Sequence, residues 1–170
     1  MTEYWDLFDT YRQPLARQHK RGVPLVEGTF HVVVSVWTVN EKNEILLTLR
    51  SPQKELYPNV WENTSGSVLA KESSRAGAKR ELQEETGIVA NEDELLFLGT
   101  ARKASAFVDV YMVKKNQKDL TITLQDGETV DFKWVTLSEL DQIVERGELA
   151  FPVAYRFSQF RVVIEEQLAR

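Results

Sequence analysis

Three glutamates stand close together in one segment of the chain, at positions 81, 84 and 85. If the segment is a helix, the side chains of Glu81 and Glu85 lie ~40° apart, and Glu84 lies ~60° to the other side of Glu81. Like charges four residues apart destabilise a helix by roughly 0.2–0.5 kcal/mol per pair, so the cluster must be solvated or neutralised. A hard divalent cation prefers carboxylate oxygens, so the cluster is either a solvated acidic face or a Mg²⁺ site, with Mn²⁺ as a substitute.

The residues around the three glutamates favour the metal site. Gly66 permits a close approach of the backbone just before the helix, and Glu72 lies ahead of the helix start. Arg80 can meet Glu72 and can also reach Glu84, four residues further on, which would hold Glu84 in one rotamer. Leu82 is expected on the opposite side of the helix, in the core.

The segment from Gly66 to Ile88 resembles a complete Nudix box, the signature of the Nudix hydrolase family, with every defining position filled. This resemblance implies an α/β/α sandwich with a mixed sheet between helices. It also implies Mg²⁺-dependent hydrolysis of a nucleoside diphosphate linked to another group. By position, the resemblance assigns metal binding to Glu81, Glu84, Glu85 and the carbonyl of Ser65, and it assigns their orientation to Glu72 and Arg80.

In such a reaction the metal polarises the phosphoryl oxygens and a carboxylate takes a proton from the attacking water. The base in this family is sometimes a glutamate of the box and sometimes one from a later loop. Glu81 fits the first option here. Glu128 fits the second, although it is equally well explained as a solvated residue of a turn.

The N-terminal half also resembles isopentenyl-diphosphate isomerases, which share the fold. That resemblance assigns diphosphate binding to Arg50 and Lys54, although both could be solvated loop charges. The isomerase reaction needs a cysteine, and Ser65 stands at the corresponding position. His31 matches one metal-binding histidine of the isomerases, but the partner histidines are missing, so we expect a structural role for it.

Three functions remain to be compared: a pyrophosphohydrolase, which we favour, an isomerase-like enzyme, and a non-catalytic nucleotide sensor. We expect a small phosphorylated substrate, and a nucleoside di- or triphosphate is the default. The aromatic residue Trp37 is a candidate to stack on a base, as are Tyr57, Trp61 and Phe107, although each could equally be packing in the interior.

The amino-acid composition excludes several other classes of function. The chain has 170 residues and a formal net charge of −5, which does not suit a protein that grips nucleic acid by its phosphates. It has no cysteine, which excludes disulfides and thiolate chemistry. The N-terminus is acidic and aromatic, and no apolar run is long enough to span a bilayer. We therefore expect a cytoplasmic protein without membrane contact, and a homodimer is left open.

The whole chain, residues 1–170, is expected to form one domain, with residues 1–27 as an N-terminal arm or hairpin. The apolar and β-branched patterns predict strands and helices in mixed order, which favours a mixed sheet between helices. The expected strands are 31–39, 44–50, 95–98, 106–113 and 129–135, and the expected helices are 73–86, 137–146 and 152–168.

Overall fold

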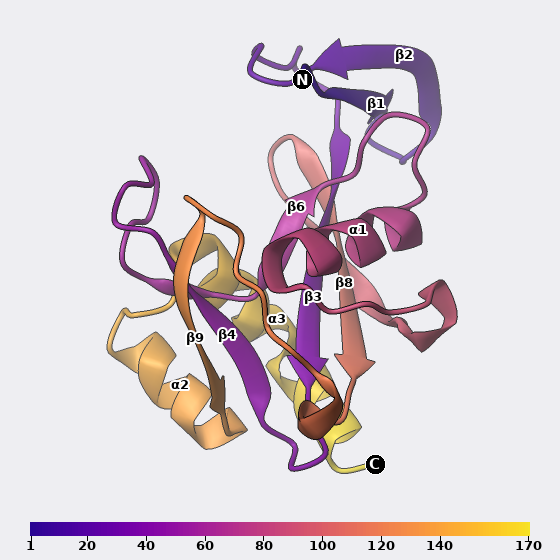
Figure 1. Ribbon diagram of the computed structural model, residues 1–170. Coiled ribbons are helices and arrows are strands. Elements are labelled where there is room, and N and C mark those ends of the chain that lie inside the picture. The colour runs from indigo at the N-terminus through magenta and orange to yellow at the C-terminus, as the bar shows by residue number, and fades with distance from the viewer.

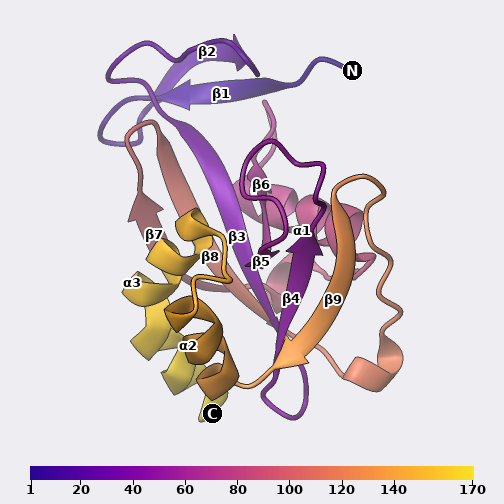
Figure 2. The same cartoon turned by 90° about the vertical axis from the view of Figure 1, so that its left-hand side faces the viewer.

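The computed structural model describes residues 1–170 and has three layers, with a central sheet between helices (Figure 1). Helix α1 (Ser74–Thr86) covers one face, and helices α2 (Leu137–Glu145) and α3 (Phe151–Leu168) cover the other, as Figure 2 shows. The strands are β1 (Tyr4–Phe8), β2 (Pro14–Lys20), β3 (His31–Val39), β4 (Ile45–Arg50), β5 (Trp61–Glu62), β6 (Thr64–Ser67), β7 (Leu96–Arg102), β8 (Ala106–Lys114) and β9 (Thr129–Val135). The predicted α/β/α sandwich is confirmed.

The central sheet has seven strands and is mixed. Its main path runs β5-β4-β3-β8-β7, while β6 pairs with β3 and β9 pairs with β4. Only β3 and β8 are parallel; the other pairs are antiparallel. Strand β6 pairs with β3 over Val33–Val36, and β4 pairs with β3 at Val39. The sheet divides between these two pairings, and the loops beside the division surround a cavity.

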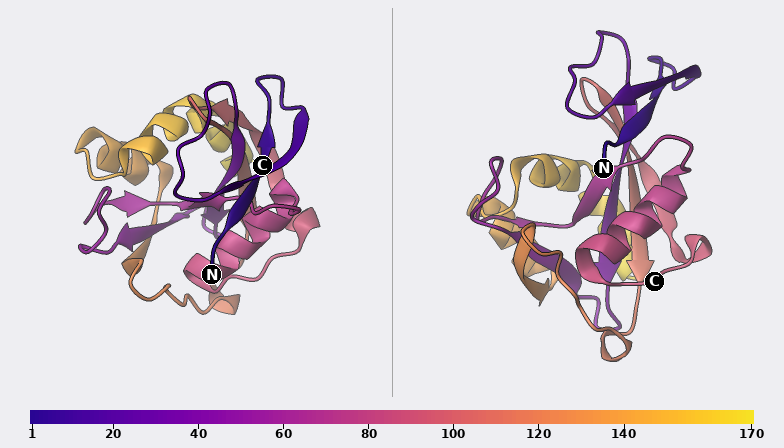
Figure 3. Two further views of the ribbon diagram at one scale, coloured as in Figure 1. Left: turned by 90° about the horizontal axis from the view of Figure 1, so that it is seen from above. Right: turned by 45° about the horizontal axis from the view of Figure 1, so that its top comes forward.

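The side chains of strand β3 pack into the apolar clusters on both faces of the sheet. Val32, Val34 and Val36 belong to the apolar cluster beneath α1, whereas Trp37 and Val39 belong to the larger cluster beneath α2 and α3. Side chains alternate between the faces of a strand, so a strand buried on both faces is mostly apolar. The view from above in Figure 3 shows the sheet edge-on between α1 and α3.

Local signals set both ends of helix α1. The Ser73 side chain accepts a hydrogen bond from the Ala76 N–H at 3.1 Å and caps the first turn. Gly87 follows the last turn with a φ of 75°, a left-handed conformation that glycine adopts without strain. These two caps set where the helix begins and where it ends.

The N-terminal arm is a hairpin formed by β1 and β2, and it lies over one end of the central sheet (Figure 1). Arg12, between the two strands, makes a paired contact with Asp109 of β8, with nitrogen–oxygen distances of 2.7 and 2.5 Å. Asp109 also accepts from Ser74, the first residue of α1. The hairpin is therefore tied both to the sheet and to the start of the helix that carries the three glutamates.

The largest difference from the predicted elements lies at β7, which continues to Arg102 rather than ending at Leu98. Its pairing with β8 shifts register between Phe97 and Gly99, so the strand passes through an irregularity and then resumes. The short strands β5 and β6 were also not predicted, because their pairing with β4 and β3 is a tertiary feature. No helix is both long and apolar enough to cross a membrane.

Candidate active site

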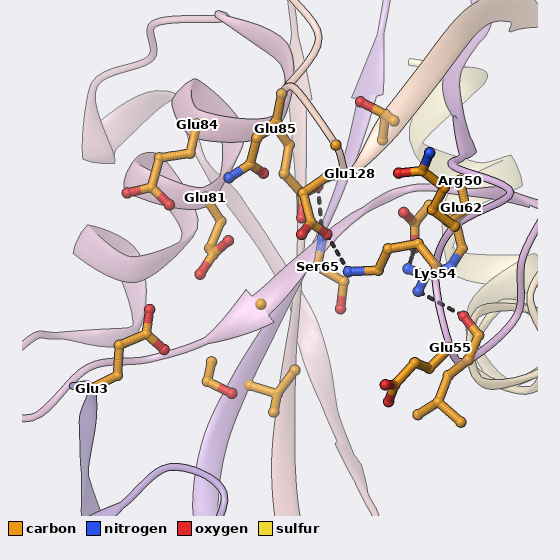
Figure 4. A pocket seen from close by; sticks show the side chains of 18 of the residues that line it. Glu3, Arg50, Lys54, Glu55, Glu62, Ser65, Glu81, Glu84, Glu85 and Glu128 are labelled. Carbon is orange, nitrogen blue, oxygen red and sulfur yellow. Dashed lines mark hydrogen bonds and ion pairs between the residues drawn. The ribbon is translucent and has the colours of Figure 1, made fainter. Parts of the chain in front are cut away.

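A polar cavity of about 810 Å³ lies between strand β6, helix α1 and the loops that precede β5 and β9 (Figure 4). Seven glutamates contribute to its walls, and only two apolar side chains, Val33 and Leu56, do so. The lining includes eight residues predicted from the sequence: Arg50, Lys54, Ser65, Gly66, Glu81, Glu84, Glu85 and Glu128. The fold therefore brings together groups that lie far apart in the sequence.

Arg80 fixes the glutamates of helix α1 in place. It meets Glu72 with two hydrogen bonds, from Nε at 2.9 Å and from Nη2 at 3.0 Å. Its Nη1 donates to Glu81 at 2.8 Å and to Glu84 at 3.2 Å. Nη2 also donates to the carbonyl of Ser67 on β6, at 3.0 Å. The geometry expected for Glu72, Arg80 and Glu84 is thus present, and the arginine joins the helix to the adjacent strand.

Gly66 leaves the space that the Glu81 carboxylate occupies. A Cβ atom at position 66 would lie 2.1 Å from the Glu81 Cδ and 2.2 Å from its Oε1. No atom can be accommodated at that distance, so glycine is required here for close approach and not for backbone conformation. Leu82, on the other side of the helix, is fully buried in the core as predicted.

Glu85 faces the cavity with little to balance its charge. The hydrogen bond it receives comes from the Ser65 N–H at 3.4 Å, which is long. Burial raises the pKa of Glu85 well above its ordinary value, and the neighbouring carboxylates of Glu62 and Glu81 raise it further. Burial also raises the pKa of Glu81, against the opposing effect of Arg80. A cation near these groups would stabilise their ionised forms.

The opposite wall carries the basic side chains. Arg50 donates to Glu62 at 2.8 Å and to the carbonyls of Leu56 and Tyr57 at 2.8 and 2.9 Å. Lys54 forms an ion pair with Glu128 across the cavity mouth. Lys54 and Glu128 therefore line the cavity as an ion pair, and the Glu128 side chain is 45% exposed. Figure 4 shows both pairs beside Glu85.

Trp37 does not contact this cavity, and the expectation that it binds substrate does not hold. Its side chain is 1% exposed in the core beneath α2 and α3, and its ring lies 5.8 Å from that of Phe157. His31 is structural, as expected. Its ring stacks on Trp5 at 4.0 Å, and burial lowers its pKa to about 4, so it is neutral at physiological pH.

Several residues of the site were not predicted from the sequence. Glu62 lies on the short strand β5 and faces Glu85, and Glu3 and Arg21 of the N-terminal hairpin reach the cavity from outside the central sheet. The signal for Glu62 was weak: a carboxylate three residues before Ser65 in the stretch that resembles the isomerases. Glu3 and Arg21, which form an ion pair with each other at 2.5 Å, have no local signal.

Gly77 lies against the side chains of Glu72 and Val68. A Cβ atom at position 77 would lie 3.0 Å from the Glu72 Oε2 and 3.1 Å from Val68. The glycine therefore makes room for the carboxylate that holds Arg80.

The side chains fit a hard divalent cation by their chemistry. The donors are carboxylate oxygens, and Glu62, Glu81 and Glu85 repel one another in the absence of an added positive charge. As the side chains stand, no three acidic, cysteine or histidine residues converge into a complete metal site. Arg80 holds Glu81 and Glu84, and this accounts for the separation of their oxygens from Glu85.

Comparisons with known proteins agree with this geometry. A model of the NUDIX domain matches residues 29–155. The chain is 36% identical over 152 residues to an uncharacterised Nudix hydrolase of Listeria monocytogenes, covering 86% of this chain and 87% of that protein. It is 29% identical over 156 residues to an isopentenyl-diphosphate Delta-isomerase of Paenarthrobacter aurescens, covering 88% and 85%. The crystal structure of DR0079 from Deinococcus radiodurans superposes with a TM-score of 0.71 at 24% identity, covering 87% of this chain and 92% of that one.

Proposed function

The chain belongs to the NUDIX domain family of hydrolases, and on that premise we propose that it hydrolyses a diphosphate linkage in a nucleoside diphosphate derivative with Mg²⁺ as cofactor. The observation that carries the proposal is the position of Glu85. It points into the cavity from α1 beside Glu81, opposite a wall that carries Arg50 and Lys54. Acidic groups for a metal thus face basic groups for a phosphate across one space.

In this proposal the residues divide between binding and chemistry. Glu81, Glu84 and Glu85 hold Mg²⁺, together with the carbonyl of Ser65, and Arg80 and Glu72 orient them. A bound divalent cation supplies positive charge at the phosphoryl oxygens and lowers the pKa of water. Arg50 and Lys54 bind the diphosphate.

Water attacks one phosphorus, the bridging P–O bond breaks, and a carboxylate takes the proton that the water loses. Glu81 and Glu128 are the two candidates for the base. Burial raises the pKa of Glu81, which makes its carboxylate a stronger proton acceptor. Each candidate is held by a basic side chain, Glu81 by Arg80 and Glu128 by Lys54, and the raised pKa of Glu81 leads us to assign the proton transfer to it.

The polar lining distinguishes this function from that of the isomerases. A hydrocarbon substrate needs an apolar pocket, and only Val33 and Leu56 provide apolar surface here. Ser65 stands on β6 where the isomerase resemblance places a cysteine, and the chain has none. Phosphoryl oxygens and ribose hydroxyls match the charged and amide side chains of the cavity better.

The test of the proposed function is isotopic. The protein is incubated with Mg²⁺, ¹⁸O-labelled water and a panel of nucleoside di- and triphosphates, dinucleotides and nucleoside diphosphate sugars. We expect ¹⁸O in a phosphate-containing product of at least one compound, because water attacks phosphorus. Isopentenyl diphosphate, incubated in parallel, should give no dimethylallyl isomer. An isomer without any labelled product would reject the proposal.

Gly66→Ala should lower kcat by up to about 10²-fold while leaving the fold intact. The added methyl group must displace the Glu81 carboxylate, which is the flexible end of a side chain and can move. A displacement of about 1 Å in a catalytic group costs on the order of 10² in rate. Steady-state kinetics and thermal unfolding measure the two effects.

A double mutant provides the control for this prediction. If the methyl group acts through Glu81, Gly66→Ala should add little to the loss already caused by Glu81→Gln. Fully additive losses would show that position 66 affects the reaction by another route.

A further inference from the structure

Arg156 of helix α3 is a buried cation without a counter-ion. Its side chain is 3% exposed, its Nε has no hydrogen-bond partner, and it forms no ion pair. The contact it makes is from Nη2 to the Ser65 hydroxyl, at 3.4 Å. Arginines are almost never fully buried unless paired, because removing the charge from water is costly. The arrangement therefore calls for an anion.

The surroundings of Arg156 form a small polar cluster within an apolar core. Ser65 pairs with Ser35 across β6 and β3, and the Ser35 hydroxyl accepts from Asn63 at 2.8 Å. The Oδ1 of Asn63 has no partner either. Val153 and Phe157, the neighbours of Arg156 on α3, belong to the apolar cluster beneath the sheet. Packing alone does not account for an arginine in this position.

The cluster adjoins the cavity of the candidate active site. Ser65 lines that cavity, and its N–H points to Glu85 while its hydroxyl lies beside Arg156. Arg156 thus stands behind the cavity floor, on the far side of Ser65 from the glutamates of α1. Glu62, the carboxylate whose charge acts on Arg156, is already paired with Arg50. Burial lowers the pKa of Arg156 to about 10, so it remains charged at neutral pH.

We propose that the Ser65 hydroxyl binds an anionic oxygen of the substrate, from the phosphoryl group that lies farther from the glutamates of α1, and that Arg156, directly behind Ser65, supplies the positive charge that attracts this oxygen. This inference rests on the proposed function, since it concerns the same cavity and a diphosphate substrate. It places negative charge where the chain has an uncompensated positive one. The metal side and the Arg156 side then hold the two phosphoryl groups of one diphosphate.

The test uses inorganic pyrophosphate as the probe. Binding is measured by titration calorimetry with Ca²⁺ present, at about 0.15 M ionic strength. The substitution Arg156→Met keeps the length of the side chain and removes its charge. We expect it to weaken pyrophosphate binding at least tenfold, and we expect unfolding without the anion to occur at the same or a higher temperature, because a buried charge is gone.

The matched control lies on the same helix. Arg161 pairs with Asp141 at 2.8 Å and is remote from the cavity, so Arg161→Met should bind pyrophosphate like the wild type. Equal affinities for wild type and Arg156→Met would overturn the inference and would show that Arg156 is a structural residue only.

A second measurement needs no variant that might fail to fold. The Nε–H resonance of Arg156 in the wild-type protein should shift when pyrophosphate is added, while that of Arg161 should not. An unmoved Arg156 resonance at saturating pyrophosphate would reject the inference.

These outcomes are separable from the ¹⁸O experiment, which tests turnover. Labelled product without Arg156-dependent binding would remove this inference alone. Arg156-dependent binding without labelled product would remove only the hydrolase proposal.

Discussion

Hydrolysis is expected to stop when divalent cations are removed with EDTA, and to return when Mg²⁺ or Mn²⁺ is added in excess. The reason is electrostatic. Glu62, Glu81 and Glu85 face one cavity, and their mutual repulsion together with burial raises the pKa of Glu85 well above its ordinary value. An anionic substrate entering a cavity with seven glutamates would be repelled unless a cation reverses the local field. The measurement is the initial rate against free metal concentration.

The control for chelation is a measurement of folding. Far-UV circular dichroism in EDTA should match that of the metal-loaded protein, because the cavity lies outside both apolar clusters. Full turnover in EDTA would refute the metal-dependent mechanism. Loss of the fold in EDTA would instead show that the cation is structural.

Glu85→Gln should lower kcat by roughly 10²–10⁴, the range expected when a main catalytic contribution is lost. The amide keeps the shape of the side chain but removes the charge that would bind the metal. Glu85 is the least compensated of the three glutamates of α1, because Arg80 contacts the other two and not this one. Steady-state kinetics at saturating Mg²⁺ measure the loss.

The stability of Glu85→Gln should move in the opposite direction to its activity. In EDTA the wild type bears the cost of burying a carboxylate beside Glu62, and the neutral amide avoids that cost. We therefore expect the variant to unfold at the same or a higher temperature in EDTA. The exposed Glu145 on α2 offers a control, since Glu145→Gln should change neither quantity. If Glu85→Gln kept wild-type kcat, the Glu85 carboxylate would have no role in the reaction.

Local sequence predicted helix α1, which carries the three glutamates, almost entirely. Helix α1 begins after a serine cap and ends before a left-handed glycine, and both are signals that act within one turn. The contact of Arg80 with Glu84 spans four residues, so helix geometry determines it once the helix forms, whereas Glu72 meets Arg80 from the turn that precedes the helix. Strand β9 was predicted with both ends correct, because its ends coincide with turn residues and a helix cap.

The tertiary structure alone decided two features: which face of the sheet a side chain lies on, and which short strands pair. Trp37 is apolar and aromatic, and its sequence neighbours do not reveal whether it faces a core or a cavity; the packing of α3 on that face of β3 buries it. Strands β5 and β6 are too short to have a period, so their pairing with β4 and β3 defines them.

Residues far from α1 in the sequence also reach the site only through the tertiary structure. Glu62 became a neighbour of Glu85 through the register of β5, and Glu3 entered the cavity because the N-terminal hairpin folds over the sheet. The single hydrogen bond of Arg156 to Ser65 joins residues 91 positions apart. Short-range spacing therefore predicted the acidic side of the site, because one helix carries it. The basic and polar sides depend on contacts between distant segments, and only the folded chain brings those together.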